Sequence, residues 1–221
     1  MKNLLWLPIA LTLALCCAPP PAPKDDDAGL RIDLPPYAGK RPAVAVLDLR
    51  NASGFDDARI GRGVADMLIT ALVSTGRFTV VERNDQVLQK IFAEQKLGQS
   101  GAVTAQTAAK AGQLLGARAA AYGEVTEFAI RKTGAYVGLA GTKTITTRTA
   151  IDVRLADAST GEIIAAASGV GSSSTSTSGI ALTVEFGTAG FDETSIGRSL
   201  RKAVNQVAIK LAQAVDQGLI K

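Results

Sequence analysis

The hydrophobic pattern of this chain changes near residue 126, and this change constrains the fold more than any other feature. Before it, short apolar runs that predict strands alternate with segments whose apolar residues recur every three or four positions, which predicts helices. Strands and helices in alternation pack as a largely parallel sheet covered by the helices, so we predict an α/β fold. The predicted strands are residues 42–48, 77–82 and 119–128, and the predicted helices are residues 60–74, 84–95 and 104–115.

Beyond this point apolar and polar side chains alternate with the two-residue period of strands. Residues 144–155 follow this pattern, residues 162–168 form a further predicted strand, and the pattern returns at Ile180, Leu182, Val184 and Phe186. Residues 169–179 between them are almost entirely Gly, Ser and Thr, and this tract is either a hydrophilic strand or a flexible loop. A last, amphipathic helix is predicted from residue 194, because apolar residues there recur at steps of three or four.

The N-terminus has the layout of a secretory signal peptide. Lys2 precedes an apolar run at residues 4–15, which is shorter than the roughly 17–25 residues that a membrane-spanning helix needs. Cys16 and Cys17 follow, and a small-residue site that ends in a cysteine resembles the lipobox of bacterial lipoproteins. Cys17 is the preferred lipidation site because the small Cys16 precedes it, whereas the bulky Leu15 precedes the second choice, Cys16.

The sequence predicts that the chain is divided into three parts. We assign residues 1–16 to a lipoprotein signal peptide, 17–40 to a Pro-rich tether and 41–221 to one folded domain. No Asp stands next to either candidate cysteine, and in lipoproteins of diderm bacteria this implies sorting to the outer membrane. We therefore expect a lipid-anchored protein on the periplasmic side of the outer membrane.

The residue content argues against an enzyme. The chain has no histidine, which is the commonest general base and zinc ligand, and its only two cysteines lie at the predicted lipidation site. We therefore expect no catalytic residue, no metal and no cofactor. The net charge of +4 is mild, and aromatic residues make up only 5%, too few for base-stacking surfaces, so we expect no nucleic-acid partner.

Seven segments, in this order, carry a resemblance to a known family. They are VAVLD at 44–48, GRGVADML at 61–68, GRFTVVER at 76–83, LGQSG at 97–101, AAKAGQLLGA at 108–117, GEVTEF at 123–128 and VRLADASTGE at 153–162. Together they span about residues 42–215, and the set resembles the CsgG/HfaB family of lipoproteins that form the curli secretion channel. The resemblance implies a homo-oligomeric ring in the outer membrane that exports protein substrates without ATP, together with accessory periplasmic proteins.

In this family each subunit contributes two β-hairpins to one shared transmembrane barrel, and the chain has two insertions of suitable size. They are roughly residues 128–151 and 168–192. A membrane strand needs about 9–11 residues with one face toward lipid, and Ile180, Leu182, Val184 and Phe186 form a possible lipid-facing strand. Four strands cannot close a barrel alone, so membrane insertion would require oligomerisation. The alternative is that both hairpins are soluble extensions of the periplasmic sheet.

The curli channel narrows at a loop between its first strand and first helix. The corresponding loop here is short, residues 50–59, and it offers Asn51 and Phe55 as possible constriction residues. Phe55 has a second interpretation as an anchor in the core.

Two functions from different classes follow. The first is a subunit of a curli-type secretion and assembly channel. The second is a periplasm-facing lipoprotein adaptor of an envelope or cell-wall machine, without pore activity. The state of the two hairpins distinguishes them, because a pore needs both of them intact, oligomeric and in the membrane.

Overall fold

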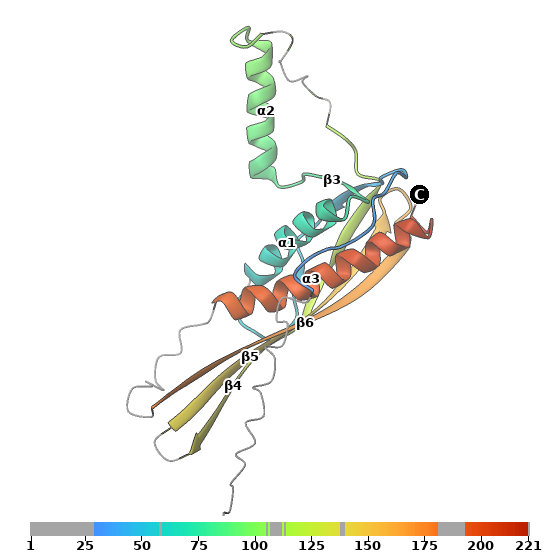
Figure 1. The fold of residues 1–221 in the computed structure, drawn as a ribbon. Helices are drawn as coiled ribbons and strands as arrows, with labels where there is room; N and C mark the ends of the chain where they lie inside the picture. Colours follow the sequence, from blue (N-terminus) through green and yellow to red (C-terminus); the bar gives the residue numbers. More distant parts are fainter. Residues whose placement is uncertain are drawn as a thin grey trace, which may run out of the picture.

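The computed structural model describes residues 29–57, 59–104, 106, 112, 114–137, 140–180 and 193–220. Its strands form one six-stranded sheet in the order β3-β1-β4-β5-β6, and β2 pairs with β4 beside β1 (Figure 1). The strands are β1 (Ala43–Val46), β2 (Arg50–Asn51), β3 (Thr79–Val81), β4 (Ala119–Val137), β5 (Ala140–Asp157) and β6 (Ile163–Ile180).

The sheet combines a parallel part with an antiparallel part. β1 runs parallel to both β3 and β4, whereas β5 runs antiparallel to β4 and to β6. The change of strand direction falls where the hydrophobic pattern changes along the chain, so the predicted α/β class and the predicted parallel part are confirmed. β3 and β6 form the two edges of the sheet among the described strands.

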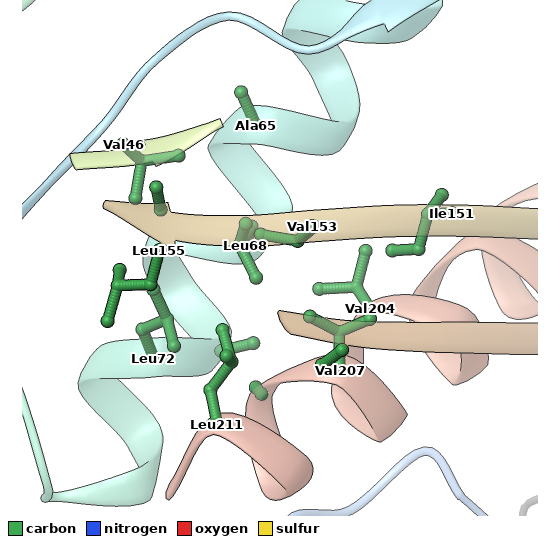
Figure 2. Packing of buried hydrophobic residues seen from close by; sticks show 14 of the residues in the cluster. Val46, Ala65, Leu68, Leu72, Ile151, Val153, Leu155, Val204, Val207 and Leu211 are labelled. Carbon is green, nitrogen blue, oxygen red and sulfur yellow. The ribbon is translucent and has the colours of Figure 1, made fainter. Parts of the chain in front are cut away.

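Two helices cover one face of the sheet. α1 (Arg59–Thr75) contacts β1, β2, β3 and β4, and α3 (Glu193–Asp216) contacts β5, β6 and α1. The core lies between these helices and the sheet, and Figure 2 shows how Leu68 and Leu72 of α1, Leu155 of β5 and Leu211 of α3 converge there. Full burial of one such side chain contributes about 1.5–3 kcal/mol, so this cluster is the main source of stability.

α3 approaches β6 so closely that only glycine fits beneath it. A Cβ atom at Gly169 would lie 2.1 Å from the carbonyl oxygen of Ala203, and one at Gly171 would lie 1.9 Å from that of Ser199. Both distances are far below van der Waals contact. Gly169 and Gly171 therefore set the distance between the last helix and the sheet.

α2 (Asp85–Gln99) projects beyond the end of the sheet, as Figure 1 shows, and contacts no other helix or strand of the described part. Asn84 caps it as predicted, because its side-chain oxygen accepts the backbone N–H groups of Gln86 and Val87. The helix predicted at 104–115 is not seen where the chain is described: Thr104 and Leu114 lie in irregular structure, and most of the segment lies outside the described residues.

The end of the predicted tether packs against the domain. The side-chain amide of Asn205 in α3 donates to the carbonyl oxygens of Gly29 (3.0 Å) and Leu30 (2.9 Å), and Ile32 and Tyr37 pack against the core. The apolar side chains of this stretch therefore bind the folded part. The predicted signal peptide and both cysteines lie outside the described residues.

Candidate functional site: the strand extension

The lower halves of β4, β5 and β6 form a three-stranded sheet that the first turns of α3 cover only in part (Figure 1). We call this part the extension and define it as residues 127–137 of β4, 140–150 of β5 and 170–180 of β6. Phe128 pairs with Thr149, and the register runs on without interruption to Val137 and Ala140. The first predicted hairpin is thus present as β4 and β5. The Gly/Ser/Thr tract is a strand, part of β6, and not a loop.

One face of the extension, which we call the open face, points away from α1 and α3 and is covered by hydroxyl groups. Thr144 and Ser176 approach to 2.9 Å through their side-chain oxygens, and Thr146 and Ser174 approach to 3.1 Å. Further up this face the guanidinium Nε of Arg148 donates to Glu127 Oε2 at 2.9 Å. This face therefore presents hydroxyls and charges.

The other face, which we call the helix face, is also polar where the first turns of α3 cover it. Ser195 shares a hydrogen bond with Thr175 (2.9 Å), and Ser199 shares one with Thr149 (3.1 Å). The hydroxyls of Thr147 and Ser173 are buried beside them without a hydrogen-bond partner among the described residues. An unsatisfied buried hydroxyl costs about 1–3 kcal/mol, so this end of the interface is weaker than the apolar core. The pairing of β5 with β6 places the hydroxyls of Thr147, Thr149, Ser173 and Thr175 on the same face of the sheet.

The outer edge of β6 is blocked near the core and open further down. Gln206 Oε1 accepts the backbone N–H of Val170 at 2.7 Å, and Lys210 Nζ donates to the carbonyl oxygen of Ser168 at 2.7 Å. Beyond Val170 no described strand pairs with this edge, and none pairs with β4 beyond its contact with β2 at Val125. Neither edge of the extension therefore has a neighbouring strand in the described part of the chain, and an edge of this kind is a template for another strand.

The loop between β2 and α1 is held together by Asn51. Its side-chain Nδ2 donates to the carbonyl oxygens of Phe55 (2.7 Å) and Asp57 (3.0 Å), and its Oδ1 accepts from the backbone N–H and the hydroxyl of Ser53. Phe55 packs edge to face on Phe128, with ring centroids 4.9 Å apart. Both predicted constriction residues thus make contacts within their own subunit, and Phe55 rests on the core as its second interpretation proposed.

Two carboxylates near the ends of elements have lowered pKa values. Hydrogen bonds from the side chain and the backbone N–H of Arg59 hold the pKa of Asp57 at about 2, below its ordinary value of 3.8. The backbone N–H groups of Ser159 and Thr160 lower the pKa of Asp157 in the turn between β5 and β6. Asp57 thus accepts the backbone N–H of the first residue of α1, and Asp157 stabilises the turn between β5 and β6.

The sequence did not predict that the Arg77 side chain is a buried cation. The Arg77 side chain is 3% exposed, forms a bidentate pair with Asp216 (3.2 and 3.3 Å), donates to the carbonyl oxygen of Thr75 and lies 5.3 Å from the ring centroid of Tyr37. It joins the turn after α1 to the end of α3 and to Tyr37 in the irregular segment before β1. Its partners are far apart in the sequence, so no local spacing indicates the contact. The hydroxyl residues Ser195 and Ser199 did carry a signal, since they interrupt the apolar stripe of the last helix at a four-residue spacing.

The remaining predicted site residues are only partly described. Ile180 ends β6, while Leu182, Val184 and Phe186 of the possible lipid-facing strand and the lipidation candidates Cys17 and Cys16 lie outside the described residues. These assignments stay predictions. Within the described ranges no helix is both long and apolar enough to cross a membrane. In the same ranges no group of three or more acidic or thiol side chains is placed to share a metal ion.

Comparison with known proteins adds the family. The family described as "Curli production assembly/transport component CsgG" matches residues 31–221. NMB1126/NMB1164, a protein of Neisseria meningitidis serogroup B that its name describes as a candidate lipoprotein, is 31% identical over 193 residues, which cover 82% of this chain and 80% of that protein.

Solved structures with similar folds have low sequence identity. A variant PelC dodecamer from Paraburkholderia phytofirmans is 16% identical with a TM-score of 0.40, and the match covers 80% of this chain and 92% of PelC. Lipoprotein GNA1162 from Neisseria meningitidis is 19% identical with a TM-score of 0.30, over 66% of this chain and 88% of that one. The match of the CsgG family to nearly the whole domain, together with the Neisseria relative, shows that this chain is a lipoprotein of the CsgG family.

Proposed function

We propose that the protein is an outer-membrane lipoprotein that assembles with itself and serves as a non-catalytic, periplasm-facing component of an envelope export or assembly machine. In this proposal the extension stands in water and pairs with neighbouring subunits. The single observation that supports it best is the polarity of both faces of the extension.

A strand in a bilayer must turn an apolar band of about 25 Å toward lipid. The open face instead carries Arg131, Arg148 and the hydroxyl rows of β5 and β6, and the helix face carries Lys132 and Lys143. Either orientation would expose a Lys or Arg to lipid, at a cost of about 2–4 kcal/mol each near the midplane. Neither face of the described strands therefore provides the lipid-facing surface that a barrel needs.

Self-association follows from the edges of the extension. An exposed strand edge in water pairs readily with another strand, and proteins that stay monomeric block such edges with side chains or bulges. Here Gln206 and Lys210 block the upper part of the β6 edge, whereas the lower part and the β4 edge are without a partner strand in the described structure. When the β6 edge of one copy pairs with the β4 edge of another, both of these edges gain a partner strand. In a closed ring every such edge is paired.

A second function, a channel subunit that exports protein substrates without ATP, is favoured by a different observation. The extension strands have the length of about 9–11 residues that a membrane strand requires. The sequence that follows β6 continues the alternation with Leu182, Val184 and Phe186. In that function the charged side chains of the extension face the lumen or an interface between subunits, and accessory periplasmic proteins deliver the substrate.

Size and conductance of the intact protein distinguish the two functions. The lipidated full chain is extracted in mild detergent, its mass is measured by light scattering, and it is then added to a planar bilayer. The proposal predicts a multi-subunit particle and a silent bilayer. Large conductance steps that vanish when residues 180–186 are removed would instead establish the channel. A monomer with a silent bilayer would contradict self-association itself.

A further inference from the structure

The end of the sheet at β1 and β3 carries an acidic hollow. It has a volume of about 490 Å³ and lies where β1 and β3 end, between α1 and the start of α2. Its lining includes the four carboxylates Asp48, Asp66, Glu82 and Asp85, and Leu47, 45% exposed, contributes apolar surface. Asp48, Asp66 and Asp85 are exposed to solvent, whereas Glu82 is half-buried and accepts the backbone N–H groups of Arg83 and Asn84.

The hollow contains two arginines and four carboxylates, so its net charge is negative. Arg62 lies 3.7 Å from Asp48 across the surface. The guanidinium of Arg83 is engaged elsewhere, since it donates to the carbonyl oxygens of Glu82 and Leu115. Two carboxylates remain in excess, so the hollow attracts a cationic surface.

The outer surface of α3 has the opposite charge. The helix carries four cations, Arg198, Arg201, Lys202 and Lys210, and no carboxylate between residues 194 and 215. Lys210 is bonded to the edge of β6, while Arg201 is exposed and Arg198 is half-exposed. α3 lies over β5 and β6 and the hollow adjoins β1 and β3, while Arg201 and Asp66 line a second cavity where α1 contacts α3.

We infer that the acidic hollow of one copy receives the basic surface of α3 of the next copy. The inference rests on the self-association proposed above and names the surfaces that carry it. A contact between two different surfaces is head-to-tail, and it builds a ring or an open array in which all copies point the same way. It also places the β6 edge of one extension beside the β4 edge of its neighbour, so the charged contact and the open strand edges favour the same arrangement.

The test uses charge reversal in the full lipidated chain, with mass measured in mild detergent. One variant changes the hollow (Asp48→Lys with Asp85→Lys), and the other changes the helix (Arg198→Glu with Arg201→Glu). We expect each alone to raise the apparent dissociation constant at least about tenfold at low ionic strength, because like charges then face each other. The effect shrinks in ~1 M salt, where the screening length falls to about 3 Å.

Mixing the two variants distinguishes loss of the head-to-tail contact from a folding defect. The hollow variant keeps a native α3 and the helix variant keeps a native hollow, so an equal mixture assembles with the two variants alternating, because each contact then pairs opposite charges. A chain with all four substitutions has both charges inverted and assembles like the parent. The control, Arg154→Glu with Glu162→Lys, reverses charges outside both surfaces and leaves assembly unchanged.

Three results would overturn the inference. Variants that assemble like the parent would place the contact elsewhere while self-association stands. Loss of assembly without rescue in the mixture or in the fourfold variant would show that the substitutions act through folding. Binding of the parent to phosphatidylglycerol vesicles that is lost in the helix variant, with assembly intact, would assign the α3 surface to the membrane. A monomeric parent would instead contradict the proposed function, before any variant is made.

Discussion

At the scale of single residues, Asn51 determines the shape of the loop that the sequence nominated as a constriction. Its amide donates to two carbonyl oxygens and accepts from Ser53, so all four hydrogen bonds stay inside the loop. Net contributions of about 0.5–1.5 kcal/mol for each bond predict that Asn51→Ala lowers the free energy of unfolding by about 2–6 kcal/mol in urea titration. Asn51→Asp keeps the acceptor and loses both donors, so we expect about half of that loss. Unchanged stability in both variants would show that the loop does not depend on this side chain.

The Asp57 carboxylate tests the electrostatics of the same loop. Its pKa of about 2 reflects the hydrogen bonds from Arg59, which favour the charged form in the folded state. The lowered value means that this stabilisation is fully present above the ordinary pKa of 3.8 and is lost as the pH falls from about 4 through about 2. We expect carbon-detected NMR titration to give a midpoint near 2, and Arg59→Gln to return it toward the ordinary range. A midpoint near 4 in the parent would contradict the observed pairing.

At the scale of elements, the packing of α3 on β6 depends on glycine. Gly171→Ala places a methyl group 1.9 Å from the carbonyl oxygen of Ser199, so the helix must move away from the strand. Such overpacking costs about 1–3 kcal/mol. Gly197→Ala in α3 is the matched control, because nothing lies within 4 Å of the added methyl group. It should stabilise the helix by roughly 0.5–1 kcal/mol. Melting temperatures that move in the same direction for both variants would contradict this account of the interface.

Prediction from the sequence succeeded for elements whose own side chains define a period. The helices at α1 and α3, the cap at Asn84 and the strand alternation in β5 all follow from local patterns. The continuous β6 did not, because a run of Gly, Ser and Thr has no apolar face, and only pairing with the threonines of β5 makes it a strand. The same limit applies to Arg77, whose partner Asp216 is distant in sequence and becomes adjacent only through the fold.

At the scale of the whole molecule, the domain and the extension have separate tasks. The core under α1 and α3 holds the fold, while the extension has few apolar contacts and two edges without a partner strand in the described structure. We predict that replacing residues 131–146 by Asn-Gly, which closes β4 and β5 with a two-residue turn, leaves the thermal unfolding of the domain nearly unchanged and reduces the particle to small species in light scattering. A full-sized particle from the shortened chain would show that the extension does not contribute to assembly.

The most direct test of the central claim, that the extension stands in water, is a labelling scan on sheared outer-membrane fragments, whose periplasmic side is accessible. Single cysteines are introduced in a Cys16→Ala background at neighbouring positions of β5, Thr144→Cys on the open face and Ile145→Cys on the helix face, with Ser159→Cys as the exposed control. A membrane-impermeant charged maleimide should modify both neighbouring positions at rates similar to the control, because neither face meets lipid. Protection of one position and reaction of its neighbour, abolished by detergent, is the period-two pattern of a membrane strand and would contradict the account.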